Sequence, residues 1–448
     1  MKLTKLLPLA ALTAAFVIPD EQVMNQVAIE THETSSTISH KVPSKEQVHN
    51  CLEDVFSKGL RASKNTFDQA LDQASEAGDK IAGKFGDAVA NTKSWLESAS
   101  TTSHGHHGHH GKPNQTVYQL IAESKYTTKL TKLINEYPDL VKALNGSAAN
   151  YTVFAPTDHA FDKIPEHAPK PSKEDLKKVL EYHLSAEFYP AGRVLVTHTI
   201  PTLLEGEDIG FEPQRLSTNI GLRGLTVNFY SRIIAIDIFG TNGVIHGVDS
   251  ILIPPPTTVD IITLLPGEFS TLELGLTKTG LLPILNDTSN HIGGTVFAPS
   301  NFAFLKLGPR INAFLFSSYG QKYLKALLAY HVVANQTLYS DAFYKAEGVD
   351  QSGIPKGLFH VDLPTLLEDK SLSIDIGRYG RLISIKINGF ADVTIEDGIA
   401  KDGVVQVVSS VLIPPKSVGG VLQQWQGEEL SEEELRERLE PFVGQDEL

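Results

Sequence analysis

Two stretches of the chain alternate apolar and polar residues with a period of two. Residues 225–229 read Leu-Thr-Val-Asn-Phe, and residues 383–387 read Ile-Ser-Ile-Lys-Ile. Successive side chains of a strand point to opposite faces of a sheet, so this pattern predicts half-buried strands. Short apolar runs at 152–154 and 295–297 predict two further strands.

Helical segments precede the strands in each half of the chain. Residues 117–144 carry apolar residues at helical spacing, and a proline after each short strand predicts a turn into another helix. Asn-Gly at 242–243 and Asp-Gly at 402–403 lie between strand-like runs, where both dipeptides accept the positive φ angles of a tight hairpin. Proline pairs at 254–255 and 414–415 end the last strands, because proline cannot donate to a ladder. The pattern predicts an α+β fold with helices packed on an antiparallel, strand-rich half.

Four sequence blocks occur twice in the same order, which predicts two tandem domains. The first copies begin at Thr116, Tyr151, Val179 and Asn242, and the second copies begin at Thr258, Gly294, Leu327 and Asp402. The offset grows from 142 to 160 residues, so the second copy carries insertions, the largest between 333 and 402. We divide the chain into a signal peptide (1–18), a hydrophilic segment with a His/Gly-rich linker (19–112), two domains (113–256 and 257–416) and an acidic tail (417–448).

The repeated blocks resemble the fasciclin domain family, in a layout closest to its fungal-type members. Thr-Val-Phe-Ala-Pro-(Thr/Ser)-(Asp/Asn)-x-Ala-Phe is similar to the first signature of the family, Tyr-His to its central dipeptide, and (Asn/Asp)-Gly-Val-(Ile/Val) through Leu-Ile-Pro-Pro to its second signature. Gly247, Gln406 and Ser409 depart from the family pattern. The resemblance implies two compact wedges of β-strands with a helical layer. It also implies extracellular or secretory-pathway modules for adhesion and matrix binding, usually N-glycosylated.

The N-terminus has the pattern of an export signal. Lys2 and Lys5 precede an apolar stretch over 6–18 that is too short to span a bilayer, with small residues near its end. Five acceptor tripeptides for N-glycosylation support this prediction, at Asn114, Asn145, Asn150, Asn286 and Asn335. Asn150 and Asn286 are the favoured acceptors, because they lie in or near predicted loops.

Composition narrows the classes of partner and site. A net charge of -14 argues against a nucleic-acid partner, which needs clustered lysine and arginine. The one cysteine, Cys51, excludes an intrachain disulfide and a thiolate zinc cluster. No apolar run of 18 residues follows the N-terminus, so we expect no membrane span there.

The segment before the first domain contains two further patterns. Residues 67–95 show heptad spacing diluted by Ala, Gly and Thr, which predicts a marginal amphipathic helix, with a coiled-coil dimer as the alternative. The tract from His104 to His110 holds five histidines separated by glycines. Imidazole binds zinc, copper or nickel, so weak metal binding is an open alternative there. We favour a flexible linker, since glycine-rich backbone is costly to order.

The acidic tail holds half of the net charge and predicts a solvated appendage. Residues 427–448 contain nine carboxylate side chains against two arginines. The ending from Gln445 to Leu448 is similar to a lumenal retention signal, although glutamine replaces the usual first residue. An ordinary acidic terminus is the alternative.

The repeated polar residues predict structural roles, and we assign no catalytic, cofactor or metal residue. Asp158 becomes Asn301 in the second copy, and His246 becomes Gln406. An amide keeps the hydrogen bonds of an acid or an imidazole but loses the proton chemistry. We therefore expect turn or helix capping at Thr157-Asp158 and at the matching Ser-Asn pair, and a buried polar contact at the histidine of each Tyr-His dipeptide. No motif typical of a hydrolase, a phosphate loop or a dinucleotide site occurs.

These observations favour a non-enzymatic glycoprotein of the secretory pathway. We expect a secreted or cell-surface protein whose two modules bind a protein, glycan or matrix surface. The alternative is a lumenal factor of the vacuole or endoplasmic reticulum that acts in trafficking or quality control. An enzyme is a third class, for which the sequence offers no positive feature.

Overall fold

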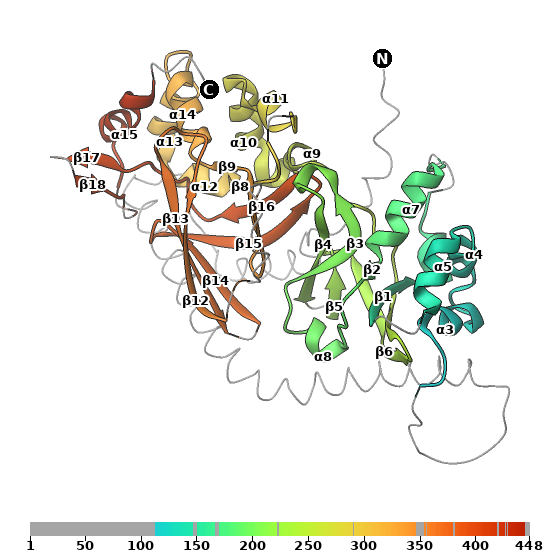
Figure 1. The fold of residues 1–448 in the computed structure, drawn as a ribbon. Helices are drawn as coiled ribbons and strands as arrows, with labels where there is room; N and C mark the ends of the chain where they lie inside the picture. The colour runs from blue at the N-terminus through green and yellow to red at the C-terminus, as the bar shows by residue number, and fades with distance from the viewer. Residues whose placement is uncertain are drawn as a thin grey trace, which may run out of the picture.

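The computed structural model describes residues 113–443, except 147–149, 166–169, 222–223, 290, 346–353, 355, 380, 419–420, 426 and 428. Its two domains follow one another along the chain, the first blue to green and the second yellow to red (Figure 1). The predicted signal peptide, heptad pattern and histidine tract lie outside the described residues, and so does the ending from Gln445 to Leu448.

The first domain places a group of short helices beside a seven-stranded sheet of order β2-β1-β7-β6-β5-β4-β3 (Figure 1). Its helices are α3 (Val117–Glu123), α4 (Thr128–Ile134), α5 (Pro138–Asn145), α6 (Asp158–Asp162), α7 (Lys173–Tyr182), α8 (Ala191–Val194) and the 3-10 helix η2 (Glu207–Ile209). Its strands are β1 (Tyr151–Pro156), β2 (Leu184–Ser185), β3 (Thr199–Gly206), β4 (Glu212–Gly221), β5 (Gly224–Val227), β6 (Ser231–Gly240) and β7 (Gly243–Val248).

The second domain repeats this plan with longer helices and a sheet of order β12-β13-β14-β15-β16-β8-β9. Its helices are α9 (Thr258–Leu264), α10 (Pro266–Thr279), α11 (Leu281–Leu285), α12 (Asn301–Lys306), α13 (Gly308–Leu315) and α14 (Gln321–Ala329). Its strands are β8 (Gly294–Pro299), β9 (Val332–Ala334), the paired β10 (Gln336–Leu338) and β11 (Phe343–Lys345), β12 (Gly357–Pro364), β13 (Ser371–Tyr379), β14 (Leu382–Ile387), β15 (Ala391–Ala400) and β16 (Gly403–Val408).

The signature strands β1 and β8 lie in the core of their domains. Phe154 and Phe297 are fully buried, as expected for strands covered on both faces. The α+β fold with a helical layer on each sheet confirms the fold class predicted from the sequence.

One part of the strand prediction is wrong. The sheets are not wholly antiparallel, because β1 pairs with β7 in parallel and β8 pairs with β16 in parallel. Nearly a whole domain separates each pair along the chain. A connection of that length can return the strand in either direction, whereas the hairpins between neighbouring strands are antiparallel by necessity.

The Asn-Gly turn exists, but its physical reason differs from the prediction. Asn242 is not among the residues with positive φ. Its buried amide instead accepts a hydrogen bond from the Val117 backbone N–H and donates to the Leu144 carbonyl oxygen, both over 2.9 Å. A Cβ atom at Gly243 would lie 2.3 Å from the carbonyl oxygen of Tyr151. Close approach of β1 therefore requires the glycine, and the asparagine joins the turn to the first helices.

The acidic tail is not a solvated appendage over its described part. It forms the hairpin of β17 (Lys416–Val418) and β18 (Val421–Gln423), the helix α15 (Glu432–Leu439) and the 3-10 helix η3 (Glu440–Phe442). Leu435 and Leu439 are fully buried in the core of the second domain, to which the buried Trp425 also belongs. The carboxylates occupy the outer face of α15, and its few apolar residues share the inner face.

Candidate functional site

The Tyr-His dipeptides hold the same position in both domains, at the end of a helix. The Nδ1 of His183 lies 2.7 Å from the Val179 carbonyl oxygen, and its Nε2 accepts from the Leu252 backbone N–H over 2.9 Å. His331 repeats both contacts, with the Leu327 carbonyl oxygen and the Leu412 N–H, each over 2.8 Å. Each imidazole therefore ties its helix to the segment after the last strand of its sheet, with Nδ1 protonated and Nε2 accepting.

Burial keeps these two histidines neutral. Loss of hydration lowers the pKa of His183 and the pKa of His331 to about 4. The hydroxyl of the neighbouring Tyr182 is also hydrogen-bonded: it donates to the Arg215 carbonyl oxygen over 2.9 Å and accepts from the Asn228 amide over 3.0 Å. The structure thus shows a buried polar contact at the histidine, as the sequence predicted.

The acid-to-amide exchange between the copies preserves a contact to a neighbouring helix. Asp158 accepts from the Lys129 backbone N–H and from the Thr128 hydroxyl, both over 2.8 Å, at the start of α4. Asn301 likewise accepts from the Thr271 N–H over 2.9 Å, in the first turns of α10. Capping by Asp158 is therefore confirmed in kind but not in place, because the capped helix is a neighbouring one. Asn301 instead bonds backbone groups within α10, where its amide also donates to the carbonyl oxygens of Pro266 and Gly267, both over 3.1 Å.

The residues just before this pair differ between the copies. Ser300 caps its own helix by accepting from the Ala303 N–H over 3.2 Å. Thr157 makes no such bond, and its hydroxyl is buried without a partner. The predicted cap at Thr157 is therefore wrong, because the hydroxyl does not meet a free N–H of α6.

The histidine-to-glutamine exchange also preserves hydrogen bonds. His246 accepts at Nδ1 from the Asp237 N–H over 3.4 Å and lies 2.8 Å from the Tyr189 carbonyl oxygen at Nε2. Gln406 accepts from the Asp397 N–H over 3.1 Å and donates to the Leu338 carbonyl oxygen over 2.9 Å. A second exchange acts in the same way, since Ser409 replaces Asp249 as an acceptor for the strand opposite.

The two domains meet at a hydrogen-bonded junction around Asp341, a residue of the second domain that is 8% exposed. Its carboxylate accepts from the backbone N–H and the hydroxyl of Thr199 in the first domain, with the backbone N–H at 2.8 Å. Arg215 lies 3.8 Å away and donates to the Tyr344 hydroxyl over 2.8 Å. The buried charges of Asp341 and Arg215 are thus paired across the junction.

Arg381 makes a second set of contacts across the junction. Its guanidinium donates to the carbonyl oxygens of Leu195 over 2.8 Å and of Thr218 over 2.9 Å. Its own carbonyl oxygen accepts from Nε2 of His198 over 2.8 Å. An apolar cluster joins the domains beside these contacts and contains Ile209, Tyr339, Ala342, Tyr344, Ile399 and Val404.

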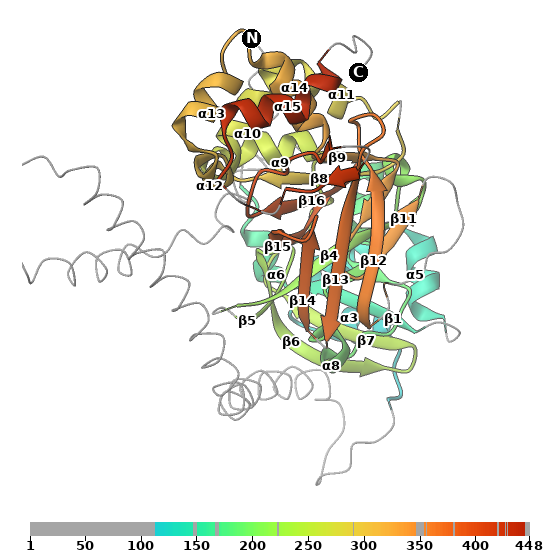
Figure 2. The ribbon, with the colours of Figure 1, turned by 90° about the vertical axis from the view of Figure 1, so that its left-hand side faces the viewer.

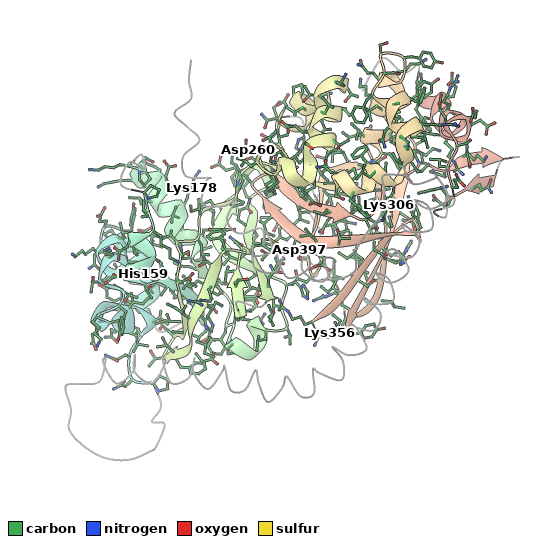
Figure 3. The ribbon with its side chains drawn as sticks, turned by 180° about the vertical axis from the view of Figure 1, so that it is seen from behind. His159, Lys178, Asp260, Lys306, Lys356 and Asp397 are labelled. Carbon is green, nitrogen blue, oxygen red and sulfur yellow. The ribbon has the colours of Figure 1, made fainter. Side chains whose placement is uncertain are left out.

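Asp397 is a second buried acid near the junction, between the two domains in Figure 3. It accepts from the backbone N–H of Ser340 over 2.7 Å and from the hydroxyl of the same residue. Burial, and next the nearby charge of Asp341, raise the pKa of Asp397 to about 7. This carboxyl group therefore exchanges its proton close to neutral pH.

Two hollows open at the junction. The first is about 130 Å³ and almost wholly apolar, between β4, β15, α9 and the proline-rich connection over 253–256. The second is about 370 Å³ and polar, and three arginines with two carboxylates line it: Arg193, Arg215, Arg378, Glu187 and Asp341. No pattern in the sequence predicts either hollow.

The second domain also exposes apolar side chains at the end of β12, β13 and β14 from which Arg381 contacts the first domain; these strands run side by side (Figure 2). Leu358, Tyr379 and Leu382 are 81%, 65% and 58% exposed. Leu358 pairs with Gly377 and Tyr379 with Leu382, so all three lie on one face of the sheet. We call these three residues the strand tip; Figure 3 labels Lys356 at the same end. The three strand-tip residues lie in the insertion between 333 and 402. They occupy the face of the strands on which the period-two alternation otherwise places polar residues.

All five predicted glycosylation acceptors are exposed: Asn114, Asn145, Asn150, Asn286 and Asn335. The side-chain oxygen of Asn145 accepts from the Thr116 hydroxyl over 2.7 Å, and that of Asn335 accepts from the Ile292 N–H over 2.9 Å. In both residues these hydrogen bonds use the side-chain oxygen and not the side-chain nitrogen, which is the atom that would carry a glycan. Glycosylation of these residues stays a prediction.

The described part of the chain lacks a metal-binding cluster and a membrane-spanning helix. Within it, no group of three or more His, Cys, Asp or Glu side chains could hold a metal ion. No helix there is both long enough and apolar enough to cross a membrane.

Comparison with known proteins gives two matched regions and several relatives. The fasciclin domain model matches residues 125–254 and 267–414. Aurofusarin biosynthesis cluster protein S of Gibberella zeae is 32% identical over 319 residues, 67% of this chain and 78% of that protein. Cell surface glycolipoprotein MPB83 of Mycobacterium bovis is 32% identical over 135 residues, 30% of this chain and 56% of that protein. A solved FAS1 domain pair from the insect cell adhesion molecule fasciclin I covers 64% of this chain and 96% of that chain, at 18% identity and a TM-score of 0.32.

Proposed function

Since the chain belongs to the fasciclin domain family, as its repeated signatures predicted, we propose that it is a non-enzymatic glycoprotein of the secretory pathway that binds a partner protein at the cell surface or matrix. The family in general consists of adhesion proteins without catalytic activity. The relative MPB83 is a cell surface glycolipoprotein by name, which supports a surface location for this chain as well.

The observation that carries the proposal is that the titratable side chains of the signatures are hydrogen-bonded to backbone groups of the fold. The imidazoles of His183 and His246 each contact two backbone groups, and the carboxylate of Asp158 accepts from the start of a helix. A general acid or base needs a titratable group free to meet a substrate. Here the titratable groups build the fold, and Gln406 and Asn301 do the same work without titrating.

The strand tip is the surface that we propose for the partner. Surface residues are usually apolar only singly, whereas here three large apolar side chains share one face and one end of a sheet. Burial of such side chains in an interface stabilises a complex, and aromatic residues such as Tyr379 are enriched at interface centres.

The test is attachment of cells or matrix to the immobilised full chain. We expect Leu358→Ser, Tyr379→Ser and Leu382→Ser, combined in one variant, to reduce attachment at least about tenfold, because interface anchors of this type each contribute above about 1 kcal/mol. The combined variant Leu274→Ser, Ile284→Ser and Leu305→Ser is the matched control, since it removes three exposed apolar side chains from helices of the same domain.

Equal attachment by the two combined variants, with unchanged melting temperatures, would remove the strand tip from the proposal. Attachment to neither cells nor matrix by the unmodified chain would contradict the adhesion function itself. Localisation of an internally tagged chain, away from both termini, separates the cell surface from the vacuole or endoplasmic reticulum lumen.

A second candidate function is favoured by one relative. Aurofusarin biosynthesis cluster protein S shares 32% identity with 67% of this chain, and its name places that protein in a biosynthetic cluster. On this reading, the chain would assist enzymes of a biosynthetic pathway without catalysing a step. Two results together would favour this candidate over adhesion. The first is co-purification of such enzymes with the tagged chain, and the second is failure of the strand tip to bind cells or matrix.

A further inference from the structure

The apolar hollow at the domain junction has the size and lining of a small-molecule site. Four aromatic side chains line it, Tyr182, Phe229, Tyr230 and Phe269, together with three consecutive prolines at 254–256. Aliphatic side chains complete the wall, among them Leu264 on α9 and Ile395 on β15. Both domains therefore contribute, so the hollow exists only when the junction is formed.

Its volume matches a single small molecule. A cavity of about 130 Å³ is close to an engineered apolar cavity of about 150 Å³ that stays dry and binds benzene. Several wall residues are half-buried, including Phe229, Tyr230 and Leu264, so the hollow reaches the surface. A molecule of one aromatic ring with a few substituent atoms fits this space.

One polar group in the wall has no partner. Ser217 on β4 is 2% exposed, and its hydroxyl is buried without a hydrogen bond. The other polar side chains of the wall are paired: the Tyr182 hydroxyl with the Arg215 carbonyl oxygen and the Asn228 amide, and the Tyr230 hydroxyl with the Ile253 backbone N–H. A buried hydroxyl without a partner is costly, so an unpaired one in a cavity wall indicates a ligand oxygen as its partner.

We propose that the junction cavity binds a monocyclic aromatic molecule that carries one hydroxyl or carbonyl oxygen. The ring packs among the four aromatic residues and the prolines, where offset or edge-to-face contacts favour an aromatic over an aliphatic group. The oxygen pairs with the hydroxyl of Ser217. The apolar lining excludes a charged ligand, because no described side chain of the wall carries a charge to pair with it. This site is independent of the strand tip and of the partner proposed there.

The test is isothermal titration calorimetry on the full chain with p-cresol, toluene and 1-hexanol as probes. A ligand of this size in an apolar cavity binds with a dissociation constant of about 0.1–1 mM, which we expect for p-cresol. We expect Ser217→Ala to weaken p-cresol at least about fivefold and to change toluene less than about twofold, because only p-cresol offers an oxygen.

A second variant tests the location of the site. Leu264→Phe fills the cavity from a half-buried position on α9 and should weaken both aromatic probes at least about tenfold. Leu274→Phe makes the same exchange on the exposed face of α10, 47% exposed, and should leave binding unchanged. Melting temperatures show that each variant is folded, so loss of binding is not confused with loss of the domain.

Three results would overturn the proposal. The first is no heat from p-cresol up to about 5 mM with the unmodified chain, which is above the range that the cavity supports. The second is equal binding by Leu264→Phe and the unmodified chain, which would place the ligand elsewhere. The third is 1-hexanol binding as tightly as p-cresol, which would make the site one for aliphatic alcohols.

Discussion

His183 and His331 show how a titratable residue can be repeated in both domains for a structural reason. Each imidazole satisfies one carbonyl oxygen and one N–H in the interior. Asparagine or glutamine suffices at the other repeated positions, where Asn301 and Gln406 keep the contacts made by Asp158 and His246. An acid or imidazole that is replaced by an amide in the other copy therefore serves hydrogen bonding and not proton chemistry.

The first residue-scale prediction compares two histidines of the first domain. His183→Leu leaves the Leu252 N–H buried without an acceptor, so we expect the free energy of unfolding to fall by about 2 kcal/mol. His246→Gln should cost less than about 1 kcal/mol, because glutamine makes the equivalent contacts in the second domain. Urea denaturation measures both variants; an unchanged midpoint for His183→Leu would show that the imidazole contributes nothing to stability.

The second prediction concerns pH. The native pKa of Asp397 is raised to about 7 from 3.8, so its contribution to stability is fully present below about pH 4 and is lost as the pH rises through 7. The native pKa of His183 and His331 is lowered to about 4 from 6.5, so their contribution is present above 6.5 and is lost as the pH falls through 4. The two histidines outweigh the single acid below their unfolded pKa of 6.5, so stability should be highest near about pH 7.

Substitution of the buried acid isolates its part of this profile. Between about pH 6 and pH 8 the loss at Asp397 offsets the gain at His183 and His331, so we expect the unfolding free energy of the unmodified chain to change by less than about 0.5 kcal/mol and that of Asp397→Asn to rise by about 1–2 kcal/mol. Asn keeps a hydrogen-bonding group beside Ser340 and tolerates the positive φ of 57° at this position. Asp392→Asn, at an acid that is 55% exposed, is the control and should keep the slope. A parallel slope in Asp397→Asn would assign the effect to another group.

At the scale of elements, long-range packing decides what local pattern leaves open. Strands β1 and β7 are parallel neighbours although the chain between them forms most of the domain. The helix α15 is rich in glutamate, yet Leu435 and Leu439 lie in the core of the second domain. A buried pair of leucines is enough to dock a short helix whose remaining residues face water.

The element-scale prediction removes this docking. Leu435→Ala should lower the unfolding free energy of the second domain by about 2–4 kcal/mol, because it leaves a cavity in a packed core. Glu433→Ala changes an exposed residue of the same helix and should leave stability within about 0.5 kcal/mol. Thermal melting measures both; equal melting temperatures would restore the view of the tail as a solvated appendage.

At the scale of the whole molecule, the junction joins the two domains into one unit. Polar contacts of Asp341 and Arg381 and an apolar cluster with residues from both domains hold it together. The apolar cavity lies at the same junction and draws its wall from both domains. A ligand in the cavity would therefore stabilise the paired arrangement by mass action.

The whole-molecule prediction uncouples the domains. Arg381→Ala removes the donors to the Leu195 and Thr218 carbonyl oxygens, so we expect one calorimetric unfolding transition to separate into two. Arg232→Ala, at an arginine that is 52% exposed and paired within the first domain, should keep a single transition. A single transition in Arg381→Ala at an unchanged temperature would show that the apolar contacts alone couple the domains.

The sequence by itself determined the repeat, the α+β class, the buried signature strands and the structural role of the polar signature residues. These follow from periodicity and from exchanges between the two copies, which are local in the chain. The parallel pairing of β1, the burial of Leu435, the strand tip and the cavity beside Ser217 were decided only by the tertiary structure. Each of them depends on residues distant in sequence, and their meeting is set by packing between whole elements and domains, which no local pattern records.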